Sequence, residues 1–422
     1  MMDCDNNVAS PFSTLPLRRR KFLKGIVAGA GALATTPGLL ARELISERTL
    51  VKSAYRGPNV IIVRFGGGAR RRETIDPGFT YSPFLCHELA KQGTLFKNME
   101  ISSFVKMKSL DGKGKPVEIE TSHGQGTLYI VSGKYDRFKD VGGKFLGQRF
   151  ESTVPTVFEY LRKTYDVPEH QTLIVNGEDR TDEEFYSFSN HHLFGAHFRS
   201  NVLSLYRFKT YLLRQQLASG KWADKDRQNK EKDLAKLEAL DYRTKGDDTQ
   251  GPEIEKFWER WREYFGETGL VNPRGDRLLT ELTVRALKEL RPRLLMVNYN
   301  DCDYVHWGNM THYTRAIAII DEGLRQIVSA VEADDEYRNN TVFVVVPDCG
   351  RDSNPFTAVP YQHHFNSRSA HEIFALMLGP GIARGATVDH PVDQISIAAT
   401  IGHVMGFQTP FTEGPVLAEA IA

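Results

Sequence analysis

The feature that most constrains the fold is a series of short, almost wholly apolar segments with longer amphipathic segments between them. Residues 294–299 (Leu-Leu-Met-Val-Asn-Tyr) and 341–346 (Thr-Val-Phe-Val-Val-Val) are two such segments, and an amphipathic run at 313–331 lies between them. A strand that is buried on both faces of a sheet is apolar throughout, whereas a helix that covers a sheet is apolar on one side. This stretch therefore predicts a strand, a helix and a second strand.

The same alternation extends over most of the chain. Further strands are predicted at 59–65, 95–105, 171–176 and 372–378, and further helices at 83–93, 153–165, 276–290 and 393–407. Strands that alternate with helices form a mostly parallel sheet with helices on both of its faces. We therefore expect the α/β class, in one large domain that extends from residue 46 to residue 422.

One segment, at about residues 200–270, departs from this alternation. Residues 221–245 are rich in charged side chains, and Trp258 and Trp261 follow in a run that is amphipathic. Charged runs of this kind usually form the solvated face of a helix. We expect a helical insertion or lid that packs beside the sheet.

The charge balance argues against a nucleic-acid partner. Among 422 residues, 54 are Lys or Arg and 53 are Asp or Glu, which leaves a formal net charge of +1, and the basic residues form no stripe. The four cysteines form no Cys-x-x-Cys pair and are too sparse for a disulfide scaffold. A chain of this length can instead bury a sizeable apolar core.

The first 45 residues are predicted to be an export signal. The run Arg-Arg-Lys-Phe-Leu-Lys at 19–24 precedes a Gly/Ala-rich apolar run at 25–41, and together they resemble a twin-arginine signal. The apolar run is short and weakly hydrophobic for a membrane span, and no other stretch approaches 18 consecutive apolar residues. We expect export by the twin-arginine machinery to the periplasm or the exterior, with no stable transmembrane segment after processing. The alternative is a basic tail before a surface helix.

Acidic, imidazole and thiol side chains gather in the loops that follow the last predicted strands. Open α/β sheets bind their ligands at the carboxyl ends of the strands, so these side chains are expected to meet. Imidazole and carboxylate groups are ligands of zinc and also suit manganese. We predict a divalent metal site, with zinc as the first choice and manganese or calcium as alternatives, although each residue alone could be a hydrogen-bonded loop residue. The candidate ligands are Asp301, Asp303, His306, Asp348, Cys349, His363 and His364.

A second polar cluster, Thr121-Ser122-His123, stands before a predicted helix. Hydroxyl and imidazole groups at a helix N-terminus meet the positive end of the helix dipole, which suits an anionic group. Thr121 or Ser122 is a candidate nucleophile if a metal ion or a base activates it. The alternative is that these residues only cap the helix.

Three glycines, Gly66-Gly67-Gly68, follow the strand at 59–65 and are followed by arginines at 70–72. A Gly-rich loop lets the backbone turn tightly and approach a ligand, but this loop has neither the Walker pattern nor Gly-x-Gly-x-x-Gly. The arginines suit either an anion site or a solvated turn.

In its order of motifs the chain resembles the alkaline phosphatase superfamily, which includes phosphodiesterases and sulfatases. The motifs are Asp303-x-x-His306, the helix with Asp321, the run Val-Val-Val-Pro-Asp-Cys-Gly-Arg at 344–351, and the final helix with Thr400. The resemblance implies two metal ions that clamp a small anionic phosphate or sulfate ester. It implies one site made of Asp303 or Asp301 with His306 and His364, a second site with Asp348, and a nucleophile at Thr121 or Ser122.

Two departures from the family pattern concern the second metal site. Gly66 stands where the first strand of the family ends in a metal-binding Asp, and Cys349 stands where a ligating His is usual. His123 lies close to the expected nucleophile, and Cys349 could ligate as a thiolate. A second ion could thus still be held by Asp348, Cys349 and His123. We therefore expect an exported, metal-dependent hydrolase-like protein with a degenerate second site. The alternatives are a catalytically inactive metal- or anion-binding protein, or a scaffold protein, of the same fold.

Overall fold

The structure is a computed structural model, and it describes residues 53–101, 109–110, 116–117, 119, 121–135, 139–140, 150–178, 183–241, 243–244, 250–267, 275–354, 356, 358–363 and 367–422. The predicted export signal, at residues 1–45, lies outside these ranges. No helix within them is long and apolar enough to span a bilayer.

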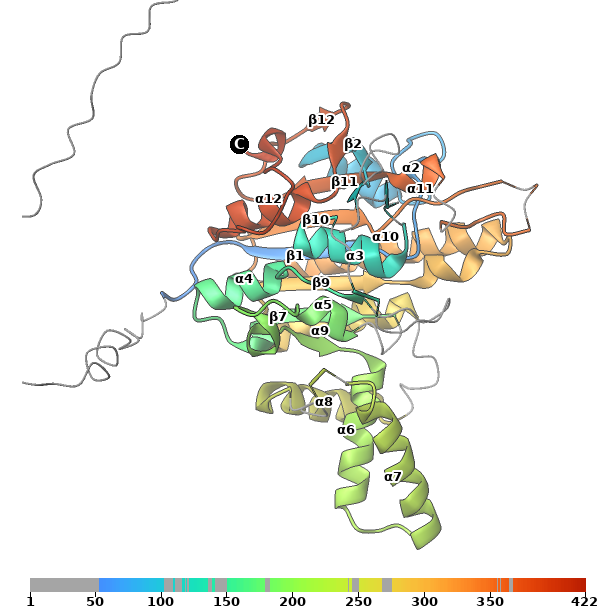
Figure 1. Ribbon diagram of the computed structural model, residues 1–422, viewed down its shortest axis with the longest axis vertical. Helices are drawn as coiled ribbons and strands as arrows, with labels where there is room; N and C mark the ends of the chain where they lie inside the picture. The colour runs from blue at the N-terminus through green and yellow to red at the C-terminus, as the bar shows by residue number, and fades with distance from the viewer. Residues whose placement is uncertain are drawn as a thin grey trace, which may run out of the picture. The chain divides into compact units, whose positions relative to one another are not determined.

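A nine-stranded sheet forms the centre of the fold, in the order β12-β2-β11-β10-β1-β9-β7-β8, with β13 also paired to β2 (Figure 1). Its strands are β1 (Asn59–Phe65), β2 (Thr94–Glu100), β7 (Thr172–Asn176), β8 (Asn201–Leu203), β9 (Leu294–Tyr299), β10 (Thr341–Pro347), β11 (Glu372–Leu378), β12 (Ala386–Val388) and β13 (Val392–Asp393). All pairings within this sheet are parallel except those of β11 with β10 and β2. The predicted mostly parallel sheet is therefore confirmed.

The reversed direction of β11 follows from what precedes it. The residues between β10 and β11 form a loop and the single-turn helix α11 (Arg368–His371), so β11 starts at the edge of the sheet where β10 ends. A parallel neighbour would need a crossover long enough to return to the opposite edge. The segment is used instead to build the loop that carries His363.

Helices cover both faces of the sheet, as the alternation predicts. Alternate residues of β1 enter two separate cores, with Ile61, Val63 and Phe65 on one face and Val60 and Ile62 on the other. The first face is covered by α6 (Leu205–Ala218), α8 (Pro252–Phe265), α9 (Asp276–Glu289) and α10 (Met310–Glu332). The second is covered by α3 (His123–Ser132), α4 (Val157–Thr164), α5 (Glu183–Ser187) and α12 (Ser396–Met405).

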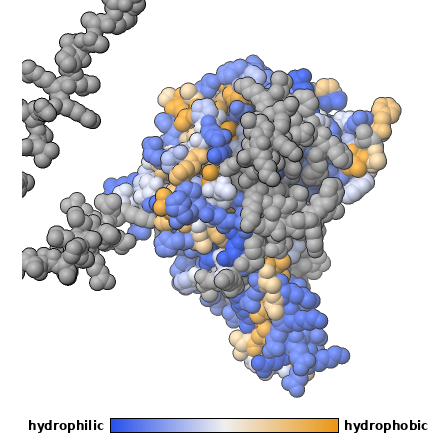
Figure 2. Space-filling model, in the orientation of Figure 1, coloured by the Kyte–Doolittle hydropathy of each residue, from blue (hydrophilic) through white to orange (hydrophobic). Residues whose placement is uncertain are grey.

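The segment at 200–270 is mainly helical but is not uniform. It begins with the edge strand β8, and its helices α6 and α8 bury apolar side chains in the core, among them Phe208, Trp258 and Trp261. Helix α7 (Asp224–Glu238), by contrast, buries none of its residues, and the surface over it is hydrophilic in Figure 2. Its charged run is a solvated face, as its composition suggests.

The segment at 83–93 does not form the predicted regular helix. A five-residue π-helical turn, Phe84–Glu88, is followed by a short 3₁₀ turn, Leu89–Lys91. The backbone N–H groups of Phe84 and Leu85 donate to the buried carboxylate of Asp321 on α10 at 3.0 and 2.9 Å. This carboxylate caps the turn and ties it to α10, so the turn is shaped by a tertiary contact and not by its own periodicity.

Candidate metal centre

The sheet brings three loops together at the carboxyl ends of its central strands. Strand β1 lies between β9 and β10, and Phe65 at its end is paired with both Tyr299 and Pro347. The loop after β9 carries Asp303 and His306, and the loop after β10 carries Asp348. Because the three strands are parallel, all three loops leave the sheet at the same edge.

The Gly66-Gly67-Gly68 loop after β1 is built for close backbone contact. Gly67 and Gly68 have φ angles of +94° and +78°, which favour glycine. Their backbone N–H groups each lie 3.1 Å from an oxygen of the Asp348 carboxylate, to which they donate. The loop therefore holds a carboxylate of the protein itself and not an external phosphate.

Three imidazole rings converge on a single carboxylate oxygen. The Nε2 atoms of His123, His306 and His363 lie 2.6, 2.8 and 3.5 Å from Oδ1 of Asp303. One ligand atom from each of these four residues lies within 4.8 Å of the others. The Asp303 side chain is 27% exposed and that of His363 is fully buried, so the cluster opens to solvent on the side of Asp303.

Two of the rings are held with their Nε2 atoms facing this cluster. The Nδ1 atom of His363 lies 2.8 Å from the backbone carbonyl oxygen of Thr121, which can only accept a hydrogen bond. The Nδ1 atom of His123 lies 2.9 Å from Oδ2 of Asp348. A proton on Nδ1 of each ring satisfies these two contacts. The backbone N of Gly67 also lies 3.1 Å from Nδ1 of His123, and with this ring nitrogen protonated its N–H is left to Oδ2 of Asp348. A bound ion would replace the proton on each Nε2 atom.

The charges in the cluster are strongly coupled. Burial would lower the pKa of His123, but the carboxylates of Asp303 and Asp348 raise it well above 6.5. Burial would raise the pKa of Asp303, yet His123 and the hydrogen bonds from the three imidazoles hold it well below 3.8. A divalent cation bound here would take the place of the imidazole proton and would interact directly with the negative oxygen of Asp303.

The remaining predicted ligands lie at different places. Asp301 is directed away from the cluster and contacts Asp276. The Asp301 carboxylate accepts the backbone N–H of Asp276 at 3.3 Å, and the Asp276 carboxylate accepts the backbone N–H of Asp301 at 2.9 Å. Cys349 is fully buried, and burial together with the charge of Asp348 raises the pKa of its thiol to about 12. His364 lies outside the described residues.

The two candidate nucleophiles differ in their availability. The hydroxyl of Thr121 is buried and donates to the carbonyl oxygen of His363. Ser122 is the N-cap of α3 and is only partly buried, and its Oγ accepts the Gln125 N–H at 3.3 Å. Both hydroxyls thus have a structural use, and Ser122 is the one with access to solvent.

The structure assigns His123 to a larger set of ligands than the sequence suggested. It was expected beside the nucleophile, or as a ligand of a second ion with Asp348 and Cys349. The structure places it near Asp348 and Cys349 and also within the set formed by Asp303, His306 and His363. The four donors are three imidazoles and one carboxylate, the ligand types of zinc sites, so the residues fit a single divalent ion that would displace the extra imidazole proton.

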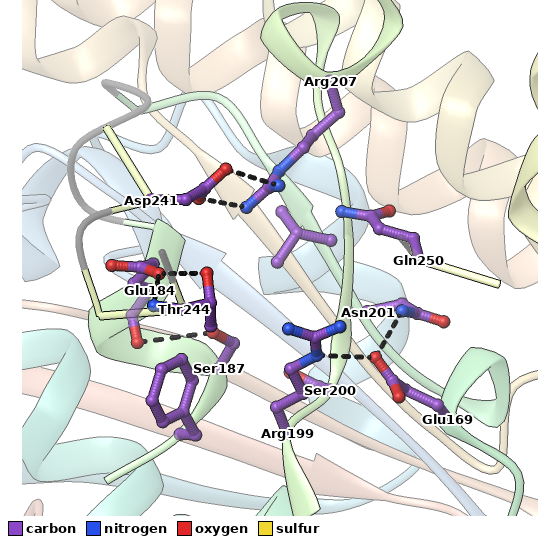
Figure 3. A pocket seen from close by; sticks show the side chains of 12 residues that line it. Glu169, Glu184, Ser187, Arg199, Ser200, Asn201, Arg207, Asp241, Thr244 and Gln250 are labelled. Atoms are coloured by element: carbon purple, nitrogen blue, oxygen red, sulfur yellow. Dashed lines mark hydrogen bonds and ion pairs between the residues drawn. The ribbon is translucent and has the colours of Figure 1, made fainter. Parts of the chain in front are cut away.

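A separate polar cavity lies among α5, β8 and α6, away from this cluster. Figure 3 shows Arg207 facing Asp241 and Glu169 between Arg199 and Asn201, and the corresponding contacts are 3.1, 3.0 and 2.8 Å. The cavity has a volume of about 20 Å³, room for about one water molecule. Its charged groups pair with one another and tie these elements together.

No protein-family model and no curated protein matches the chain. Among solved structures, it resembles a mutant of the alkaline phosphatase PafA, with a TM-score of 0.54 and 11% identity over 88% of this chain and 100% of that chain. For wild-type PafA the TM-score is 0.51 and the identity is 10%, over 88% of this chain and 100% of that chain. For the PsFucS1 sulfatase from Pseudoalteromonas sp. the TM-score is 0.47 and the identity is 11%, over 90% of this chain and 74% of that chain. The chain therefore has the fold of the alkaline phosphatase superfamily, as its motif order predicted.

Proposed function

We propose that this protein is a hydrolase of phosphate or sulfate esters that uses one divalent metal ion held by His123, Asp303, His306 and His363. The observation that carries the proposal is the convergence of three Nε2 atoms on one oxygen of Asp303. Three nitrogen donors favour zinc, with manganese next, and disfavour calcium, which takes oxygen ligands. The fold supports hydrolysis of an ester of this class, because the alkaline phosphatase PafA shares it.

The residues around the cluster would orient an anionic ester. A bound ion would supply Lewis acid chemistry, polarising an ester oxygen and lowering the pKa of water. The N-terminus of the ten-residue helix α3, which begins at His123, presents its positive end beside the ion site. Ser122, at the N-cap, is the hydroxyl best placed to act as nucleophile if its bond with Gln125 opens.

A second candidate function is metal binding without turnover. Structural zinc sites are closed by four protein ligands, whereas catalytic sites usually keep one position open. Here four ligand atoms already gather, and the hydroxyl of Thr121 is bonded to a carbonyl. If all four bind at once, the ion would stabilise three loops and would not meet a substrate.

Hydrolysis assays on metal-loaded protein separate the two functions. The purified protein is stripped with a chelator, reloaded with zinc or manganese, and assayed with 4-nitrophenyl phosphate, bis(4-nitrophenyl) phosphate and 4-nitrophenyl sulfate. The proposal expects metal-dependent release of nitrophenolate that His306→Ala abolishes. Stoichiometric metal binding with no turnover of any of the three would leave the structural function and overturn the catalytic one.

We also propose that the protein is exported by the twin-arginine route. Support comes from the Arg-Arg-Lys-Phe-Leu-Lys run at 19–24 and the apolar run that follows it. Fractionation of cells that express the full chain tests this. The mature protein should appear outside the cytoplasm and should stay inside when Arg19 and Arg20 are both changed to Lys.

A further inference from the structure

Arg64 is a fully buried cation that contacts Asp348, the carboxylate that is hydrogen-bonded to His123 in the candidate metal centre. It lies in β1, whose residues are all buried, and its side chain has no exposed surface. Its Nη1 atom lies 3.3 Å from Oδ2 of Asp348 and also donates to Thr127 Oγ1. Its Nη2 atom donates to Glu178 Oε1 and lies 3.4 Å from the carbonyl oxygen of Tyr299.

The four partners of this guanidinium are all oxygen atoms. Two come from the buried carboxylates of Asp348 and Glu178, one from a hydroxyl and one from a backbone carbonyl. Burial would lower the pKa of Arg64, but the two carboxylates outweigh it and raise the pKa, so the group remains a fixed cation. Buried carboxylates that lacked such a cation would be strongly destabilising.

We propose that Arg64 takes the place of a second metal ion, so that this chain holds a single ion and a guanidinium where its fold relatives would hold two ions. Its role is positional: it neutralises Asp348, which in turn orients His123 toward the first ion. The inference rests on the proposed function only for that first ion. The Arg64 pocket itself is made of oxygen ligands, a set that suits magnesium, calcium or manganese.

A second ion bound by His123, Asp348 and Cys349 fits the structure less well. Their ligand atoms do lie within 4.8 Å of one another. However, Oδ1 of Asp348 already accepts the N–H groups of Gly68 and Cys349 at 3.1 and 2.7 Å, and Oδ2 faces Arg64 and Gly67. An ion there would displace backbone donors and would lie beside a fixed positive charge.

Metal analysis of Arg64→Ala tests the proposal. Removal of the side chain leaves the oxygen-lined pocket without its cation, so a divalent ion should enter it. After dialysis against zinc and calcium, we expect the wild type to hold one ion per chain and Arg64→Ala to hold two. We also expect the melting temperature of Arg64→Ala to rise when calcium or guanidinium ion is added. A wild type that holds two ions would overturn the proposal, as would a folded Arg64→Ala that gains neither an ion nor stability.

Arg351 provides a matched control. It too is fully buried, but it donates to four backbone carbonyl oxygens, those of Gly67, Gly68, Cys302 and Tyr361. Arg351→Ala should lose stability without gaining an ion. An equal gain of calcium by both variants would show that any vacated arginine pocket takes cations, and would overturn the specific role of Arg64.

Two further variants keep the test decisive if Arg64→Ala does not fold. Arg64→Lys retains a positive charge and Arg64→Met retains volume alone, so the Lys variant should melt at a clearly higher temperature than the Met variant. Equal melting temperatures would show that charge is not what Arg64 supplies.

If Arg64→Ala does fold, it can be combined with His306→Ala. The gained ion should persist in this double variant, which separates failure of this inference from failure of the zinc site.

Discussion

The imidazole of His123 is hydrogen-bonded to the buried carboxylate of Asp348, with 2.9 Å between Nδ1 and Oδ2. The opposite nitrogen of the ring, Nε2, lies 2.6 Å from Oδ1 of Asp303. A carboxylate that holds the outer nitrogen of a metal-binding histidine fixes the ring and increases its basicity. Asp348 is therefore better explained as the residue that orients His123 than as a ligand of its own ion.

Asp348→Asn should weaken metal binding without removing it. The amide NH2 group would face the N–H group of either Gly67 or Gly68, which each donate to a different carboxylate oxygen, and His123 would lose its charged partner. We expect the metal dissociation constant to rise about 10- to 100-fold, the usual effect of losing such an outer contact. Competition with a chromophoric chelator measures it.

The control for Asp348→Asn is Asp352→Asn, because Asp352 follows the same strand and its carboxylate accepts from Gln362 and Ser369, two side chains outside the cluster. Its metal affinity should match that of the wild type. Equal loss in both variants would mean that the loop as a whole, and not the His123–Asp348 contact, controls the affinity.

His306→Ala should lose the ion altogether. His306 lies three residues after Asp303, and its Nε2 atom is 2.8 Å from the Asp303 carboxylate, so its removal opens one side of the cluster. His312→Ala is the matched control, since this imidazole is exposed at the start of α10. Metal content after gel filtration should be near zero for the first variant and unchanged for the second. Retention of the ion by His306→Ala contradicts the assigned ligand set.

The central strands were predictable because each is buried on both faces. The predicted bounds 59–65, 294–299 and 372–378 coincide with β1, β9 and β11. The edge strands were not predictable: β8, β12 and β13 have three, three and two residues, too few for a periodic signal. The direction of β11 could not be predicted from the sequence either, because it depends on the edge of the sheet at which the chain re-enters.

The site was predictable where it is local in sequence. Asp303 and His306 are three residues apart and follow one strand, whereas His123 and Asp303 are 180 residues apart and meet only in the folded chain. Arg64 did leave a readable signal. A lone charge in an otherwise apolar, doubly covered strand needs buried partners, and the structure shows that Asp348 is one of them.

Gly66→Ala should destabilise the fold. A Cβ atom at residue 66 would overlap the carbonyl oxygen of Tyr299 and the guanidinium of Arg64, neither of which can move freely. We expect a loss of about 1–3 kcal/mol in the free energy of unfolding, the usual cost of overpacking. An aspartate, which the family resemblance implies at this position, would meet the same obstacle. Urea unfolding measures the loss.

Gly78→Ala is the control for Gly66→Ala, since Gly78 is exposed in a turn and a Cβ atom there meets the Asp76 carboxylate at an ordinary contact distance of 3.6 Å. Its free energy of unfolding should stay within about 0.5 kcal/mol of the wild type. If Gly66→Ala were equally mild, the loop could shift to admit a side chain, and the close approach of β1 to Tyr299 would not explain the glycine.

Glu159→Gln should change how stability depends on pH. Glu159 is buried in the capping box of α4, where burial raises its pKa above 4.5 despite hydrogen bonds from Thr156, Ser189 and Gly195. Between the unfolded and the folded pKa, the folded state binds more protons, so the wild type loses stability as pH rises through this window. Glutamine cannot ionise and avoids that loss.

The quantity to measure is the free energy of unfolding of Glu159→Gln minus that of the wild type, from urea titrations at several pH values. We expect this difference to move in favour of glutamine as pH rises from below 4.5 to neutrality, because the penalty for ionising Glu159 then appears in the wild type alone. Glu263→Gln, at an exposed position of α8, should give a difference that stays constant. A difference for Glu159 that moves in the opposite direction would show that the capping hydrogen bonds outweigh burial and lower the pKa of this carboxyl.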